Sequence, residues 1–189
     1  MPYRRKRRRR RKTTKRRYTV STSKARILDV FASPVVSATD TAVQVTGVTG
    51  VSNTAGETQN RKIVNAIGDL DVSANLAGGV TVELMHLYIV LPGDADFPTV
   101  AEFDPFAPDF PGQASYKGGL AAPFGIKRFV FTNPKTASTT LFTKSIRYVS
   151  RSQRLLRPGH ALHRALYARG SASNINATAA GVIGLTVVN

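Results

Sequence analysis

The sequence predicts an all-β fold, an antiparallel double-sheet β-sandwich of eight strands. Val, Thr and Ile together supply 46 of the 189 residues, and β-branched side chains favour strands. Apolar residues recur with a period of two, and the 3.6-residue period of a helix is scarce. Eight strands with several long connections, in about 170 residues, fit a jelly roll or another Greek-key sandwich.

The expected strands alternate with segments rich in Gly, Pro, Asn and Ser. We expect strands at residues 24–31, 41–48, 61–73, 80–91, 126–133, 138–149, 154–169 and 181–188. Turn residues predict breaks at 47–56, 75–79, 92–93, 133–134, 158–159 and 170–180, and a long surface loop at 104–125. The segment 98–103 is expected to be a short helix, because Pro98 suits a first helical turn.

Two of these strands have a particular pattern. In 61–73 we expect Ile63 and Ile67 to share one face. The strand at 80–91 is apolar on both faces, which predicts a position inside a sandwich or beneath a neighbouring segment. His86 lies in this strand, so we expect an interior histidine with satisfied ring nitrogens in preference to a metal ligand.

The segment 154–169 allows two readings. Leu162 and Leu166 are four residues apart, as on a helix face. They also share one face of a strand, with Arg164 between them. The strand reading is favoured because Pro158 and Gly159 interrupt the segment and its surroundings are β.

The positive charge is concentrated at the N-terminus. The whole chain has a net charge of +16 from 27 Lys and Arg against 11 Asp and Glu, and residues 1–17 contain 12 of the bases and no acid. Such a run repels itself and buries no apolar surface. We therefore expect a disordered basic arm, residues 1–23, ahead of one folded domain, residues 24–189.

A dense polyanion is the expected partner of this arm. Lys and Arg displace counterions from phosphates, which gives strong, salt-dependent binding without sequence preference. The same run is typical of a nuclear import signal, so an import receptor is a second expected partner. The predicted nucleic-acid-binding residues are the bases of the arm and of the first strand: Arg4, Arg5, Lys6, Arg7, Arg8, Arg9, Arg10, Arg11, Lys12, Lys15, Arg16, Arg17, Lys24 and Arg26.

A second basic stretch follows in the last third of the chain. Two interpretations are equally weighted: a further nucleic-acid surface, or solvent-facing strand residues that form ion pairs between subunits. Its members have no acid among them: Arg147, Arg151, Arg154, Arg157, Arg164 and Arg169.

No catalytic, metal or cofactor site is predicted. The chain has no Cys, no HExxH and no phosphate-binding glycine loop, and His160 and His163 have no carboxylate near them in the sequence. It has no run of 18 apolar residues, so no membrane partner is expected. Five acids between residues 94 and 109 fit a calcium site, a solvated loop, or a group that pairs with Arg of a neighbouring subunit: Asp94, Asp96, Glu102, Asp104 and Asp109.

The order of segments resembles small icosahedral virus coat proteins. Residues 24–138 are similar to the coat proteins of satellite tobacco necrosis virus-like viruses and of circular single-stranded DNA (circovirus-like) viruses. The similarity lies in the strands at 24–31 and 61–73, in LMHLYIVLPGDADFPTVAEF at 84–103 and in KRFVFTNPKTAS at 127–138. Its most distinctive pieces are KRF at 127–129 and PTVAE at 98–102, and the uninterrupted arginine run resembles the circular-DNA virus capsids more closely.

The resemblance implies a structural protein with no enzymatic activity. It implies a jelly-roll subunit that self-assembles into a T=1 icosahedral shell of sixty copies and packages a single-stranded genome, DNA in preference to RNA, with its arm. The expected locations are the virion, the host nucleus and the cytoplasm. The alternative function is a basic cellular nucleic-acid-binding protein of the ribosomal or chromatin type.

Overall fold

The computed structural model describes residues 23–37, 41–54, 57, 59–92, 114–116, 119–121, 123–136, 138–171 and 175–189. None of these residues lies in a helix, so none belongs to a helix that could cross a membrane. The expected helix at 98–103 lies outside them. The strands are β1 (Lys24–Ser37), β2 (Thr41–Ser52), β3 (Arg61–Leu76), β4 (Thr81–Pro92), β5 (Ala114–Tyr116), β6 (Gly119–Ala121), β7 (Phe124–Thr132), β8 (Thr140–Ser150), β9 (Arg154–Leu156), β10 (His160–Gly170) and β11 (Ile175–Val188).

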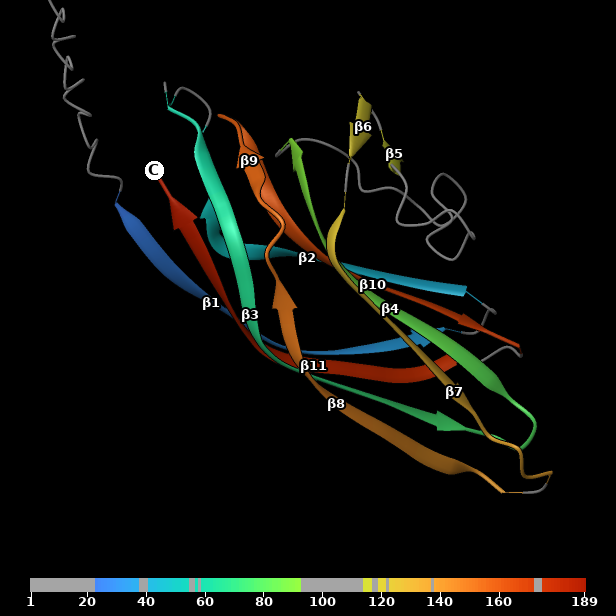
Figure 1. The fold of residues 1–189 in the computed structure, drawn as a ribbon. Helices are drawn as coiled ribbons and strands as arrows, with labels where there is room; N and C mark the ends of the chain where they lie inside the picture. The colour runs from blue at the N-terminus through green and yellow to red at the C-terminus, as the bar shows by residue number, and fades with distance from the viewer. Residues whose placement is uncertain are drawn as a thin grey trace, which may run out of the picture.

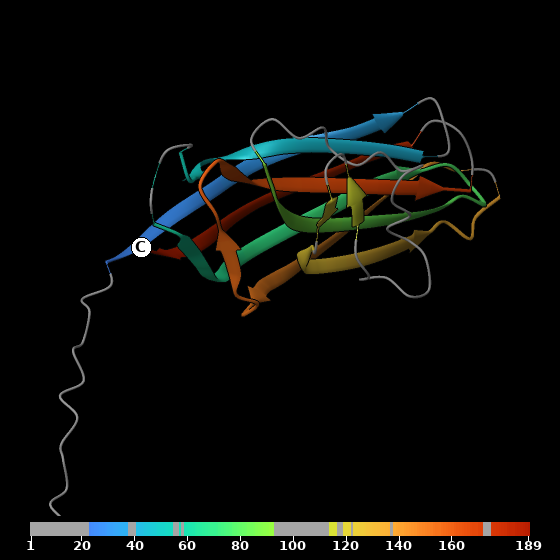
Figure 2. The ribbon, with the colours of Figure 1, turned by 90° about the horizontal axis from the view of Figure 1, so that it is seen from above.

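Two antiparallel sheets face each other and confirm the predicted all-β sandwich (Figures 1 and 2). The first sheet has the order β1-β11-β3-β8, with β9 paired to β3, and the second has the order β2-β10-β4-β7. The short strands β5 and β6 pair with each other. The core between the sheets is built from the inward-facing side chains of both layers, among them Phe31, Ile63, Leu70, Tyr88, Phe129, Leu166 and Ile183.

The eight long strands pair from the outside of the chain inward. The first, β1, pairs with the last, β11, and β2 pairs with β10. The next pairs are β3 with β8 and β4 with β7. Because these pairs alternate between the two sheets, the chain crosses from one layer to the other after each of its first strands. Figure 1 shows the consequence at the termini, where the C-terminal end of β11 lies beside the start of β1.

The expected burial of both faces of β4 is confirmed. Val82, Leu84 and Tyr88 point into the core between the sheets. The alternating residues Met85 and Leu87 point the other way and are also fully buried. The second sheet is therefore covered on its outer side as well, as a strand apolar on both faces requires.

A β-bulge corrects the predicted pattern of β3. Thr186 pairs with Asn65 and Val187 pairs with Ile63, so Val64 is an extra residue on β3. Ile63 is fully buried, but Ile67 is only partly buried because the bulge moves it to the opposite face. The expectation that both isoleucines share a face is therefore wrong.

Two of the predicted turn segments, 47–56 and 170–180, are partly occupied by strands in the structure. Strand β2 continues to Ser52, and β11 begins at Ile175, inside the segment predicted as a turn at 170–180. The region 104–125 contains β5, β6 and the start of β7, and Phe124 is buried. The prediction of eight strands thus omits the three-residue strands β5, β6 and β9.

The strand reading of 154–169 is confirmed in two pieces. Strand β9 ends at Leu156, and β10 begins at His160 after a turn at Pro158 and Gly159. In β10, Leu162 and Leu166 face the core together. The helix reading of this segment is wrong.

We expect Gly68→Ala to destabilise the protein strongly, because β3 and β11 approach each other at this point. A Cβ on Gly68 would collide with the carbonyl oxygen of Val182 and the Cα of Ile183, and backbone atoms cannot give way as side chains do. Overpacking of this kind costs about 1–3 kcal/mol or more. Gly47→Ala is the matched control, since nothing lies within 4 Å of its added Cβ. Urea denaturation should separate the two variants, and equal midpoints would contradict the close approach.

Candidate nucleic-acid interface

Lys24 and Arg26 are the two predicted nucleic-acid-binding residues that the structure describes. They lie at the start of β1, where both side chains are exposed. Odd-numbered residues of β1 such as Asp29 and Phe31 point toward the second sheet and are buried. Lys24 and Arg26 therefore lie on the outer face of the first sheet. The other twelve predicted residues, between Arg4 and Arg17, lie outside the described residues.

Strand pairing adds a third base, Lys62, which sequence reasoning missed. Val188 on β11 pairs with Lys24 on one side and with Lys62 on the other. Strands in a sheet are about 4.8 Å apart, so the two lysines flank β11 with their Cα atoms about 10 Å apart. Lys62 is exposed. Only the order β1-β11-β3 brings these residues together, and no local pattern indicates it.

Beside these bases, the last residue of the chain is hydrogen-bonded to the residue that precedes β1 and to β3. The backbone N–H of Asn189 donates to the carbonyl oxygen of Ser23 at 3.2 Å. Arg61 donates from Nε to Oδ1 of Asn189 at 2.9 Å and from Nη1 to the carbonyl oxygen of Ser52 at 2.6 Å. The point at which the N-terminal segment joins the body is therefore held by the C-terminus and by β3.

The second basic stretch does not form one surface. Arg164 is buried, while Arg169 donates to Glu83 at 2.7 Å on the surface. The Arg154 guanidinium lies 5.4 Å from the centre of the Phe124 ring. Both interpretations require exposed side chains, so the structure excludes Arg164 from each of them, and for the other five arginines both interpretations stay predictions. Contacts within the chain use three of the six arginines.

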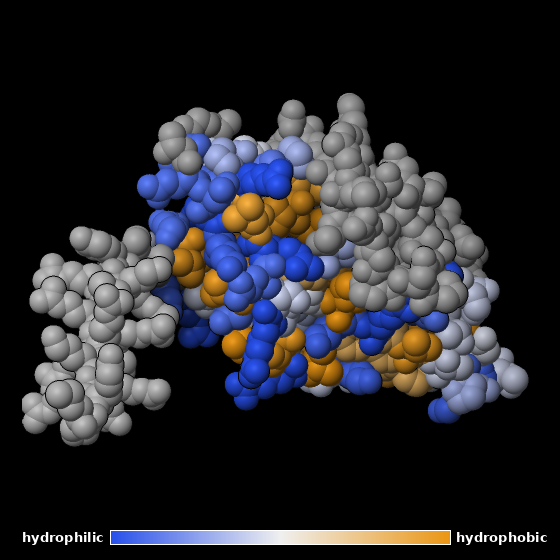
Figure 3. Space-filling model, turned by 45° about the horizontal axis from the view of Figure 1, so that its top comes forward, coloured by the Kyte–Doolittle hydropathy of each residue, from blue (hydrophilic) through white to orange (hydrophobic). Residues whose placement is uncertain are grey.

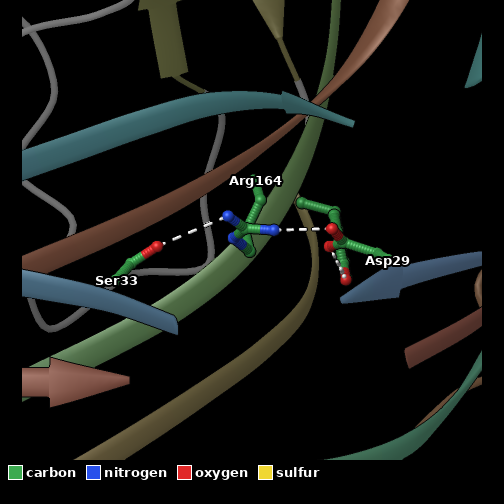
Figure 4. A network of polar contacts seen from close by, with 4 residues as sticks. Asp29, Ser33 and Arg164 are labelled. Carbon is green, nitrogen blue, oxygen red and sulfur yellow. Dashed lines mark hydrogen bonds and ion pairs between the residues drawn. The ribbon is translucent and has the colours of Figure 1, made fainter. Parts of the chain in front are cut away.

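The buried Arg164 belongs to a polar network that joins the two sheets (Figure 4). Its Nη1 donates to Oδ1 of Asp29 at 2.6 Å, and the guanidinium carbon lies 3.8 Å from the centre of the Phe31 ring. The Tyr88 hydroxyl donates to the other carboxylate oxygen of Asp29 at 2.8 Å. Ser33 accepts a longer contact of 3.5 Å from Nη2 of Arg164. Asp29 thus has partners from both β10 and β4.

Burial keeps the phenols of this region neutral. Desolvation raises the pKa of Tyr88 far above its usual value, and the adjacent Asp29 carboxylate raises it further. Desolvation and the charge of Asp29 also raise the pKa of Tyr148. Both hydroxyls therefore act as hydrogen-bond donors, Tyr88 to Asp29 and Tyr148 to the carbonyl oxygen of Gly125. The network holds the charges of Asp29 and Arg164 as one buried pair.

His86 is interior as predicted, but its ring nitrogens are not satisfied. Neither nitrogen has a hydrogen-bond partner among the described residues. The ring stacks on Phe31 at 5.6 Å and meets the edges of Tyr88 and Tyr148 at 5.1 and 5.2 Å. Burial, with the positive charge of Arg164 as a smaller cause, lowers the pKa of His86 to about 3. The histidine is therefore a neutral ring in an aromatic cage.

We expect His86→Phe to remove part of the acid sensitivity of the fold. Unfolded histidine binds a proton below about pH 6.5, whereas folded His86 stays neutral down to about pH 3. Its contribution to stability is thus present above pH 6.5 and falls between these values by about 1.4 kcal/mol per pH unit. From pH 7.5 to 5.0, the wild type should lose about 2 kcal/mol more than His86→Phe. Urea denaturation at both pH values measures this, with the half-buried His160→Gln as control.

Within the described ranges, no three His, Asp or Glu side chains come together as a metal site would require. His160 and His163, three residues apart, both lie on β10 and are half-buried. The acidic group from Asp94 to Asp109 lies outside the described residues. The part of the site that the structure describes is accordingly the basic group around Lys24, Arg26 and Lys62.

Comparison with known proteins gives this group no counterpart. No protein-family model matches the chain, and no curated protein matches it.

Proposed function

We propose that this protein is a viral capsid protein that self-assembles into a closed shell and packages single-stranded nucleic acid. Its body is a jelly roll, and its basic N-terminal arm neutralises the genome. The observation that carries this proposal is the pairing of strands from the outside of the chain inward, next to a segment with 12 bases and no acid. Two facing sheets with four long strands each in this order, the first extended by the short β9, are typical of the double-sheet jelly rolls of capsid and lectin domains.

The size of the charge supports the packaging role. With one arm per subunit, sixty arms would carry about 720 positive charges, and each nucleotide brings about one phosphate charge. Such a shell could neutralise much of a genome of about one to two kilobases. The arginine run is also typical of a nuclear import signal, which supports entry into the host nucleus through an import receptor. Its resemblance to the circular-DNA virus capsids is the reason for proposing single-stranded DNA as the genome and the virion as the final location.

Negative-stain microscopy and mass photometry of the purified full-length protein test the proposal. Sixty copies of a 20.4 kDa chain would form uniform closed particles of about 1.2 MDa. The nucleic acid inside them should resist nuclease until the particles are opened. A protein that stays monomeric or dimeric at high concentration in low salt, with or without nucleic acid, would refute the capsid role. Nucleic-acid binding without particles would support the cellular binding protein instead.

A further inference from the structure

The outer faces of the two sheets differ in how far their apolar side chains are exposed. On the second sheet, five apolar residues of the central strands β4 and β10 point away from the core and are buried, namely Met85, Leu87, Ile89, Leu91 and Tyr167. On its flanking strands, Val43 and Val130 are 41% and 61% exposed. On the first sheet, Leu28 is 57% exposed, Val30 is 68% exposed and Val182, on the central strand β11, is 48% exposed. The first sheet is therefore the more open of the two at its centre.

In the part of the chain that the structure describes, six exposed large apolar residues lie on the first sheet, namely Leu28, Val30, Leu141, Val149, Leu155 and Val182. Three of them, on β1 and β11, form a connected patch, which we call the apolar strip: Leu28, Val30 and Val182. Val30 and Val182 are direct partners across β1 and β11, and Leu28 precedes Val30 on the same face of β1. Figure 3 shows one face of the body, where hydrophobic side chains (orange) reach the surface between hydrophilic ones (blue). Isolated apolar side chains need no explanation, but a patch on an uncovered sheet face indicates a contact surface.

The bases Lys24, Arg26 and Lys62 border this strip, and we call them the basic row. Arg26 and Leu28 are two residues apart on one face of β1, which is about 7 Å. The Arg26 side chain lies over Gly184 of β11. A Cβ added to Gly184 would be 2.8 Å from Nε of Arg26. Within the described residues, none of the three bases forms an ion pair. No described acid neutralises their charges, and the side chains of Lys24, Arg26 and Lys62 are all exposed.

We propose that the basic row and the apolar strip form a second contact surface for single-stranded nucleic acid, continuous with the N-terminal arm. The row binds phosphates, and the strip contacts sugars and the faces of bases. The inference rests on the proposed function for the identity of the partner. It adds that the first sheet faces the nucleic acid and that the covered second sheet does not.

Charge favours nucleic acid over a second copy of this chain on the basic row. A two-fold contact centred there would bring like charges together, whereas a strand of phosphates matches three positive groups. The acids Asp69 and Asp71 lie on the same face of β3, and Asp69 is the direct partner of Val182. They would repel phosphates, so they confine the phosphate contacts to the end of the sheet where Lys24 and Lys62 lie and leave only sugars and bases to the strip. Exposed apolar side chains beside the row favour a single strand, since a duplex shields its bases.

Salt dependence of binding in the full-length protein tests the basic row. The double variant Lys24→Gln/Lys62→Gln should bind a fluorescent thymidine oligonucleotide with a shallower slope of log K against log salt, by about 1.4 for two lost contacts with a single strand. The control Lys135→Gln/Lys144→Gln removes the same charge from exposed lysines elsewhere on the body and should leave the slope nearly unchanged. Equal slopes for the two pairs would overturn the proposal.

Photocrosslinking with an iodouridine oligonucleotide tests the strip. Adducts should map to peptides containing Leu28, Val30 or Val182, and Leu28→Ser/Val30→Ser should reduce them several-fold. Val130→Ser, at a position 61% exposed on β7, is the control. If the double variant instead changes only the oligomeric state, the strip is a contact between copies and the proposal is wrong. The salt slope and the photocrosslinks both measure oligonucleotide binding and do not depend on particle formation. Absence of particles in the wild type would therefore refute the capsid role, while the two binding experiments alone would decide on this surface.

Discussion

The Arg164→Met variant is expected to lose about 3–5 kcal/mol of unfolding free energy, the usual cost of leaving a buried charge without its partner. Among the described residues, the Asp29 carboxylate would keep the Tyr88 hydroxyl as its one close side-chain donor, in a site where Arg164 and Asp29 are 5% and 7% exposed. Methionine matches much of the arginine stem, so little of the loss would come from missing volume. Urea denaturation at neutral pH measures the change.

Two controls separate charge from packing in that result. Arg169→Met breaks the exposed pair with Glu83, where the side chains are 45% and 36% exposed, and should cost at most about 1 kcal/mol. Asp29→Leu/Arg164→Met removes both buried charges and should recover most of the stability lost in the single variant. If Arg164→Met is as stable as the wild type, the Asp29–Arg164 ion pair does not stabilise the packing of the two sheets.

Removing the charge of the arm should have the largest effect on nucleic-acid binding. Replacing all 12 bases of residues 1–17 by Gln keeps the chain length and removes most of the +16 charge. For a single strand, the slope of log K against log salt should become shallower by up to about 8. Fluorescence anisotropy with a thymidine oligonucleotide over a series of salt concentrations measures the slope.

The fold should not depend on the arm. A chain lacking residues 1–17 should unfold at the same urea concentration as the full chain, while its particles, where they form, should contain little nucleic acid. Loss of the cooperative unfolding transition on deletion would mean that the arm contributes to the body. Unchanged packaging by the neutral arm would assign genome binding to other residues.

The long strands could be read from the sequence because a half-buried strand alternates polar and apolar residues locally. The same alternation fails at Val64, where one extra residue reverses the face of Ile67, and a bulge leaves no mark in composition. The strands β5, β6 and β9 have three residues each, too few to show a period.

The pairing of distant residues could not be predicted. Asp29 and Arg164 are 135 residues apart, and Arg164 was assigned to a surface stretch because its neighbours in the sequence are basic. Lys62 likewise joins Lys24 only through β11, which follows both of them by more than a hundred residues. The 12 bases of residues 1–17 are evident from the sequence alone, whereas the proximity of Lys24 and Lys62 depends on the strand order.

The pairing of strands from the outside inward also sets the order in which the chain can fold. The central strands β10 and β11 are the last to be synthesised, and each lies between partners made much earlier. A ribosome-bound chain that ends before His160 therefore lacks a central strand in each sheet, and β1 and β2 have no ladder partner. Such non-local pairing slows folding. The basic segment is made long before the body can close, so its 12 bases can meet polyanions while the rest of the chain is still unfolded.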